Sequence, residues 1–199
     1  MILPNQLTVL RIILSPIFLI FFMSEDVLLK QLAFIVFVIA SLTDWYDGWL
    51  ARKFNYITEW GKFLDPTADK ILTSCAFIGF VVIDVLELWM VIIILVRDFL
   101  MTGLRIYADY KNYSFKTSNL AKWKTFFQMA FLDYLLLIYT LMTFESLYKN
   151  NIGLFNTLTD KDFVYFTMLA ITFFTLITGI FYLYQNRNLI KGIFTIENK

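Results

Sequence analysis

The chain has 199 residues, a formal net charge of +1 and a mean hydropathy of +0.68, and 59% of its residues are hydrophobic. Soluble domains are usually about 45–50% apolar, so this composition excludes an ordinary soluble domain and predicts an integral membrane protein. The near-neutral charge provides no broad basic field for nucleic acid. The absence of histidine leaves oxygen atoms as the ligands of any catalytic metal.

Six apolar stretches of roughly 20 residues each are long enough to cross a bilayer as helices. In chain order they are residues 6–23, 31–51, 64–83, 88–108, 121–143 and 163–185. The first stretch lacks a lysine-rich start and a small-residue cleavage site, so we expect a spanning helix there and not a cleaved signal peptide. Because little chain is left over, we expect one all-α membrane domain over residues 1–199, with six transmembrane helices.

Basic residues are distributed unevenly over the connections between these helices. The connections 52–62 and 105–124 and the C-terminal tail carry eleven Lys and Arg residues, whereas the alternate connections carry three. Lys and Arg near membrane ends mark the cytoplasmic side. We therefore expect a multi-pass protein of the cell (inner) membrane with both termini in the cytoplasm and an active site on the cytoplasmic side.

Four aspartates lie where the second and third predicted helices end and begin: Asp44, Asp47, Asp65 and Asp69. An unpaired charge in the bilayer interior costs at least about 2.5–3.5 kcal/mol, so these carboxylates require a positive partner. Helical periodicity puts each pair on one face, and the short connection makes the two helices antiparallel neighbours. Carboxylates without histidine or thiolate select Mg²⁺, Mn²⁺ or Ca²⁺, and four are enough for two ions.

Each aspartate also has an ordinary structural interpretation. Aspartates near helix ends often cap a helix or pair with nearby Lys and Arg. Asp65 followed by Pro66 fits an N-cap with proline at the first helical position. The metal hypothesis is favoured because all four carboxylates lie on two facing helix surfaces within a predicted membrane region.

The spacing D-x2-D-G-x2-A-R-x8-G-x3-D-x3-D, from Asp44 to Asp69, resembles the signature of the CDP-alcohol phosphotransferase family, and every position matches. The resemblance implies six helices, a homodimer, a CDP-linked donor, release of CMP and two bound Mg²⁺ or Mn²⁺ ions. It implies that the four aspartates are the metal ligands. It also makes Asp69 the general base that takes the proton of the acceptor hydroxyl.

The same resemblance assigns a set of residues to binding of the CDP-linked donor: Asn5, Thr8, Asp44, Gly48, Ala51, Arg52 and Gly61. Small residues beside the aspartates leave a groove for a flat ring, and the guanidinium of Arg52 can contact a phosphate. The segment containing Asn5 and Thr8 is similar to the start of family members that make phospholipids. Its alternative interpretation is a simple amphipathic helix start, with Arg11 extending towards the membrane surface.

Four basic residues lie beside the predicted aspartate site: Arg97, Arg105, Lys122 and Lys124. Such a cluster suits a dianionic phosphate on the acceptor. The alternative is that these are interfacial cations of the cytoplasmic side, with Arg97 paired to Asp98 or Asp69. The pattern resembles the acceptor-phosphate pocket of the phosphatidylglycerophosphate synthases in this family, with Asp98 where bacterial members usually carry Glu.

The resemblance therefore implies transfer of a phosphatidyl group from CDP-diacylglycerol to sn-glycerol 3-phosphate, giving phosphatidylglycerophosphate and CMP for phospholipid biosynthesis. The same chemistry with inositol phosphate or phosphatidylglycerol as acceptor is one alternative. A cation transporter is an alternative from a different class, because intramembrane carboxylates also line ion pathways. The clustering of the aspartates towards one membrane face favours the enzyme.

Overall fold

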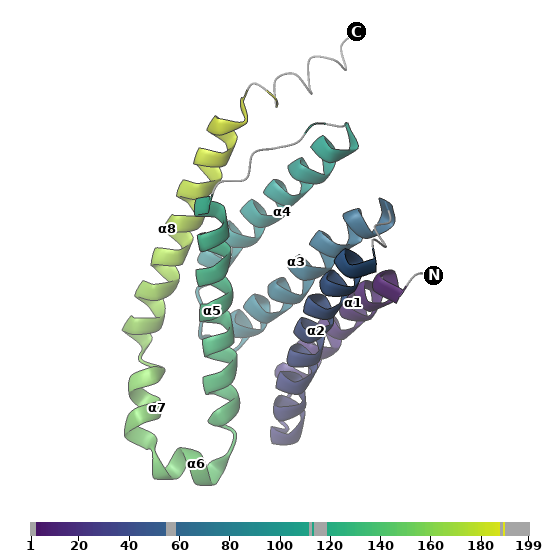
Figure 1. Ribbon diagram of the computed structural model, residues 1–199. Coiled ribbons are helices and arrows are strands. Elements are labelled where there is room, and N and C mark those ends of the chain that lie inside the picture. Colours follow the sequence, from purple (N-terminus) through teal and green to yellow (C-terminus); the bar gives the residue numbers. More distant parts are fainter. Residues whose placement is uncertain (1–2, 55–58, 112, 114–118, 188, 190–199) are drawn as a thin grey trace.

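The computed structural model describes residues 3–54, 59–111, 113, 119–187 and 189. Its described residues form helices and their connections, which confirms the all-α expectation (Figure 1). The helices of this part are α1 (Leu3–Phe22), α2 (Val27–Phe54), α3 (Glu59–Val82), α4 (Leu88–Tyr110), α5 (Asn119–Leu141), α6 (Glu145–Asn150), α7 (Ile152–Leu158) and α8 (Lys161–Gln185).

The six long helices α1 to α5 and α8 coincide with the six predicted apolar stretches and contain 20 to 28 residues each. Between α5 and α8, the connection between the last two predicted stretches contains the short helices α6 and α7. Among the described residues, Val27–Asp44 and Ile152–Gln185 are long and apolar enough to cross a membrane, and Gln6–Phe22 is a shorter apolar helix. These features are those of a membrane protein.

Helix α3 begins at Glu59, whereas an N-cap at Asp65 requires the helix to begin at Pro66. Pro66 lies inside the helix, where its missing N–H removes one backbone hydrogen bond. The interpretation of Asp65 as an N-cap is therefore wrong. Asp65 and Asp69 both lie within α3, one turn apart.

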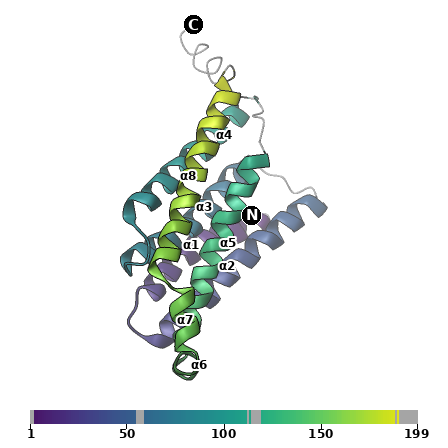
Figure 2. The ribbon, with the colours of Figure 1, turned by 90° about the vertical axis from the view of Figure 1, so that its left-hand side faces the viewer.

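Helix α1 packs against both α2 and α3, whereas α2 and α3 contact each other little. These three helices form one group, and α4, α5 and α8 form a second group. In the second group, α4 packs on α3 and α8, and α5 packs on α8 (Figures 1 and 2). The start of α1, the ends of α2 and α4 and the end of α8 lie towards the same end of the molecule, opposite α6 and α7. The two aspartate-bearing helices are thus connected mainly through α1.

The buried face of α1 changes from polar to aromatic along its length. Thr8, Arg11, Ser15, Phe18 and Phe22 are buried, at the three- and four-residue spacing of one helix face. The rings of Phe18 and Phe22 stack with centroids 5.6 Å apart. This aromatic half anchors α1 in the core, and the polar half is directed to the end of the bundle that carries the aspartates.

The aromatic end of α1 approaches α3 closely at Gly79. A Cβ at this position would lie 2.7 Å from Cδ1 of Phe22, so a residue larger than glycine does not fit without a shift. Phe22 also meets the ring of Phe80 edge-on, with centroids 5.0 Å apart. Close packing here sets the position of α1 relative to α3.

Candidate active site

Two polar residues of α1 each contact an aspartate of the family signature, one on α2 and one on α3. Nη1 of Arg11 lies 2.5 Å from Oδ1 of Asp44 on α2, and the hydroxyl of Thr8 donates a 2.6 Å hydrogen bond to Oδ1 of Asp65 on α3. Thr8 and Arg11 are fully buried. The interpretation of Arg11 as a side chain that extends to the membrane surface is therefore wrong, because the guanidinium is buried and paired with Asp44.

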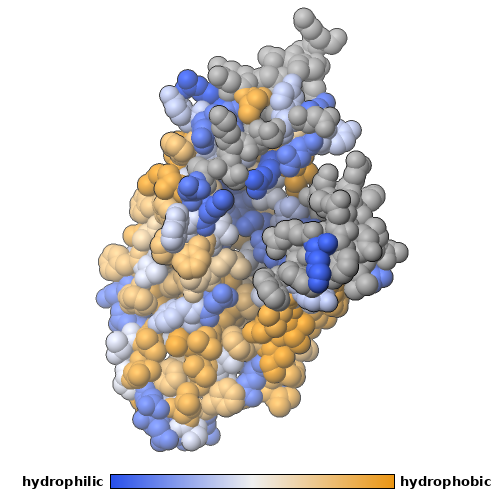
Figure 3. All heavy atoms as spheres, viewed as in Figure 1, coloured by the Kyte–Doolittle hydropathy of each residue, from blue (hydrophilic) through white to orange (hydrophobic). Residues whose placement is uncertain are grey.

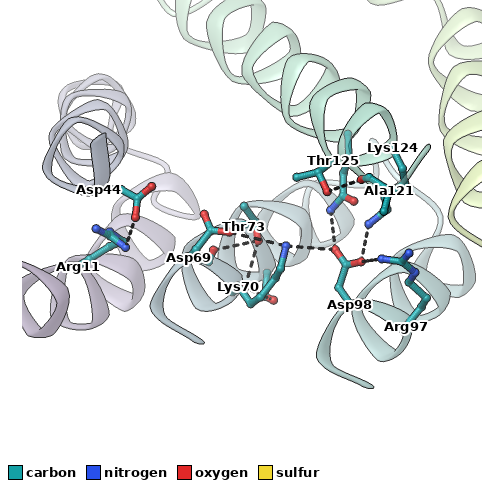
Figure 4. Close-up of polar contacts among 12 residues, drawn as sticks. Arg11, Asp44, Asp69, Lys70, Thr73, Arg97, Asp98, Ala121, Lys124 and Thr125 are labelled. Carbon is teal, nitrogen blue, oxygen red and sulfur yellow. Dashed lines mark hydrogen bonds and ion pairs between the residues drawn. The ribbon is translucent and has the colours of Figure 1, made fainter. Parts of the chain in front are cut away.

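Two of the described aspartates of the motif, Asp44 and Asp69, point towards one space (Figure 4). Asp44 is within electrostatic range of both Asp65 and Asp69. Figure 4 shows the carboxylates of Asp44 and Asp69 directed towards the space between α2 and α3. The side chains of Asp44 and Asp69 are 47% and 36% exposed, so both carboxylates are accessible. Carboxylates gathered in this way repel one another and attract a hard cation.

A cavity of about 680 Å³ lies on the other side of Asp69, between α3, α4, α5 and α8. Figure 3 shows polar side chains gathered in the upper half of this face of the molecule, above a largely apolar region. The charged residues that line the cavity are Asp69, Lys70, Arg97, Asp98, Arg105, Asp109 and Lys122. The structure thus brings the predicted base together with three of the four predicted acceptor-binding cations.

A buried carboxylate organises the basic residues on one wall of this cavity. Asp98 is 3% exposed and forms ion pairs with Lys124, with Arg97 at 3.1 Å and with Lys70 at 3.6 Å (Figure 4). Gln128 donates a further hydrogen bond of 3.3 Å to Oδ2 of Asp98. Asp98 thus neutralises cations from α3, α4 and α5 at one point.

The two lysines of α5 have different surroundings, contrary to their grouping as phosphate ligands. Lys122 is exposed and lines the cavity, whereas Lys124 is fully buried, pairs with Asp98 and is absent from the cavity lining. Residues two apart in a helix point about 200° away from each other, so the two lysines project from different sides of α5. Lys124 lies behind the cavity wall, and its role in binding the acceptor phosphate stays a prediction.

A family model described as CDP-alcohol phosphatidyltransferase matches residues 1–159 of the chain. The chain belongs to the CDP-alcohol phosphatidyltransferase family. This confirms the resemblance that the spacing from Asp44 to Asp69 indicated. Helix α8 follows the matched region.

Three curated relatives of this CDP-alcohol phosphatidyltransferase are each named CDP-diacylglycerol–glycerol-3-phosphate 3-phosphatidyltransferase. The protein from Rickettsia typhi is 42% identical over 135 residues, which cover 68% of this chain and 76% of the relative. The Bacillus subtilis protein is 43% identical over 147 residues, covering 68% and 76%. The Salmonella typhimurium protein is 35% identical over 139 residues, covering 67% and 75%.

Several predicted site residues fall outside the side chains that the structure describes: Asn5, Asp47, Gly48, Ala51, Arg52 and Gly61. Among the side chains that are described, no three acidic groups come close enough to hold one metal ion. The described aspartates supply only oxygen ligands, and Asp44 and Asp69 point towards a common space (Figure 4), which fits Mg²⁺ or Mn²⁺. The two-ion site stays a prediction for this CDP-alcohol phosphatidyltransferase.

Lys70 and Tyr182 also line the cavity of this CDP-alcohol phosphatidyltransferase, although the sequence did not single them out. The ammonium of Lys70 lies 3.7 Å from Oδ2 of Asp69 and 3.6 Å from Oδ2 of Asp98, so it links the aspartate site to the cationic wall. A charged residue inside an apolar helix was the available signal for Lys70. Tyr182 carried none, because a tyrosine in an apolar helix is ordinary.

Proposed function

We propose that this chain transfers the phosphatidyl group of CDP-diacylglycerol to sn-glycerol 3-phosphate, forming phosphatidylglycerophosphate and CMP. The observation that carries the proposal is that Asp69 and the cations Arg97, Arg105 and Lys122 line one cavity. A base for the acceptor hydroxyl and ligands for the acceptor phosphate are then available to the same small molecule. The names of the three relatives support the same reaction.

The cationic wall supplies the affinity for the acceptor phosphate. The cavity that this wall lines has a volume of about 680 Å³, which falls within the range of small-molecule pockets. Arginine guanidinium groups form paired, charge-assisted hydrogen bonds with phosphate oxygens. Arg97 donates a 3.1 Å hydrogen bond to the carboxylate of Asp98, which holds the guanidinium at the wall. Other N–H groups of the guanidinium are left for the phosphate of the ligand. Lys122 adds charge at the open side.

Asp69 is the proposed base. It accepts the proton of the primary hydroxyl of glycerol 3-phosphate, and the hydroxyl oxygen forms a bond to the phosphorus that carries diacylglycerol. The bond from that phosphorus to the oxygen of CMP breaks, and CMP leaves. The ammonium group of Lys70 lies 3.7 Å from Oδ2 of Asp69, so the proposed base has a cation beside it. No covalent enzyme intermediate is needed in this direct transfer.

The proposed ligands of two Mg²⁺ or Mn²⁺ ions are Asp44, Asp47, Asp65 and Asp69. Bound ions would supply positive charge to the donor pyrophosphate. Thr8 orients Asp65 by donating to its Oδ1, and Arg11 contacts Oδ1 of Asp44. The donor site is proposed to be completed by Asn5, Gly48, Ala51, Arg52 and Gly61.

The proposed setting is the cell (inner) membrane, crossed by α1 to α5 and α8. A helix of 20 residues is about 30 Å long, which matches the hydrocarbon core of a bilayer. These helices expose large apolar side chains, among them Ile20, Phe166 and Ile180 at 67%, 63% and 67%. The basic connections support a cytoplasmic position for both termini and the active site. A homodimer is proposed from the family resemblance alone.

The test is to reconstitute the purified protein in liposomes with CDP-diacylglycerol and Mg²⁺ and to measure CMP release with a panel of acceptors. We expect glycerol 3-phosphate to support release far better than inositol phosphate or phosphatidylglycerol. Release that depends on one of the other acceptors would assign the chain a different product. Metal-dependent cation flux without CMP formation would instead favour a transporter.

A further inference from the structure

Helix α8 follows the region that matches the family, yet its side chains contact a proposed acceptor ligand. Nη2 of Arg97 on α4 donates a 3.2 Å hydrogen bond to Oγ1 of Thr178 on α8. Beside it, Gly179 is buried, and a Cβ added there would lie 3.2 Å from Cγ and 3.3 Å from Nε of Arg97. The arginine side chain therefore lies directly against the backbone of α8.

We propose that Thr178 and Gly179 of α8 are positioning residues that direct Arg97 to the phosphate of the acceptor. The inference rests on the proposed function, because it takes the cavity beside Asp69 as the acceptor site. It makes α8 a determinant of affinity for phosphorylated acceptors, although α8 lies beyond the matched residues 1–159.

The hydrogen-bond pattern at Thr178 supports this role. Its hydroxyl donates to the carbonyl oxygen of Thr175 at 3.0 Å, which uses its single proton within the helix. The lone pairs of Oγ1 are then available as acceptors for Arg97. Asp98 receives the other arm of the guanidinium through Nη1. Arg97 is thus fixed at two points, by α8 on one side and by the buried carboxylate on the other.

The close approach of Arg97 to Gly179 is the second, steric constraint on the position of the arginine side chain. The distances of 3.2 and 3.3 Å are tighter than most contacts of a real Cβ, so an added methyl group requires Arg97 to move. Tyr182, one turn further on, is 5% exposed and lines the cavity, so this face of α8 is the face that meets the acceptor site. A small residue at 179 lets the long arginine stem pass between α8 and the cavity.

The experiment measures kcat and KM for glycerol 3-phosphate and CDP-diacylglycerol in Thr178→Val, Thr178→Ser and Gly179→Ala. Losing a hydrogen bond to a charged group raises the KM for glycerol 3-phosphate about tenfold in Thr178→Val, whereas Thr178→Ser keeps the hydroxyl and stays near wild type. Gly179→Ala raises the same KM about threefold to tenfold by displacing Arg97. In all three variants kcat and the KM for CDP-diacylglycerol stay unchanged.

Gly103→Ala is the matched control, because Gly103 lies on α4 with Arg97 and has nothing within 4 Å of an added Cβ.

Lys122→Ala tests the acceptor site itself. If Lys122→Ala raises the KM for glycerol 3-phosphate but Thr178→Val and Gly179→Ala do not, the role of α8 is overturned while the proposed function stands. If Lys122→Ala also leaves that KM unchanged, the acceptor site is misplaced. Thermal unfolding in detergent separates a loss of folding from these kinetic outcomes, and a fall in kcat at unchanged KM would contradict a positioning role.

Discussion

Arg11 on α1 and Asp44 on α2 form a 2.5 Å ion pair in which the arginine is fully buried and the aspartate side chain is 47% exposed. The pair connects the first helix to the helix that begins the family signature. Because α2 and α3 contact each other little, the positions of their aspartates depend on α1. Arg11 therefore belongs to the support of the aspartate site.

Replacing Arg11 with methionine keeps most of its length and removes its charge. Asp44 then loses a charge-assisted hydrogen bond, so we expect transfer activity to fall about tenfold or more. Arg11→Lys keeps the charge and retains more activity than Arg11→Met. CMP release with both substrates saturating provides the measurement, and full activity in Arg11→Met would show that α1 does not orient Asp44.

Asp69→Asn removes the proposed base and leaves a side chain of the same shape. A general base typically contributes about 10²–10⁴-fold to the rate, so we expect transfer to be abolished at ordinary enzyme concentrations. The variant should still insert into membranes and fold, which size-exclusion chromatography in detergent checks. Asp109→Asn, a matched charge loss at the same cavity, should reduce activity much less. Wild-type activity in Asp69→Asn would exclude this residue as the base.

Lys122 and Lys124 should respond differently to substitution. Lys122→Ala raises the KM for glycerol 3-phosphate with little change in thermal stability, because Lys122 is exposed at the cavity. Lys124→Ala removes a partner of the buried Asp98 and lowers the stability by about 3–5 kcal/mol. Paired kinetic and thermal-unfolding measurements on the two variants test this separation. Equal effects of both substitutions on KM, with no loss of stability, would contradict it.

Asp98→Ala removes the carboxylate that Lys70, Arg97 and Lys124 share. The three cations then repel one another without compensation, and we expect a stability loss of about 3–5 kcal/mol. Glu145→Gln breaks an ion pair with Lys149 whose side chains are 79% and 67% exposed, so it should change stability little. Thermal unfolding of both variants in one detergent compares them, and similar melting temperatures would refute the role of Asp98.

Gly79→Ala should destabilise the contact between α1 and α3. The added Cβ would lie 2.7 Å from Cδ1 of Phe22, so the aromatic ring or the helix must shift. Overpacking of this kind costs about 1–3 kcal/mol. Gly153→Ala provides the control, since nothing lies within 4 Å of an added Cβ there. Unaltered thermal stability in Gly79→Ala would show that the ring moves aside freely.

The sequence alone predicted the six long helices and the family because both depend on local information. Apolar stretches of bilayer length predict long helices wherever they occur. The spacing between Asp44 and Asp69 is a string of identities that needs no coordinates to be matched. The sequence grouped Lys122 with Lys124, and the structure separated them, because only Lys122 lines the cavity and Lys124 is buried against Asp98.

Only the tertiary structure decided which residues from distant helices meet. Thr8 reaches Asp65 across 57 positions of sequence, and Arg97 reaches Thr178 across 81. Neither contact produces a periodic pattern in the sequence. The first depends on the angle at which α1 packs on α3, and the second on the angle at which α8 packs on α4. The buried pairing of Asp98 with Lys124 is of the same kind, since a charge inside an apolar helix indicates that a partner exists and not where the partner lies.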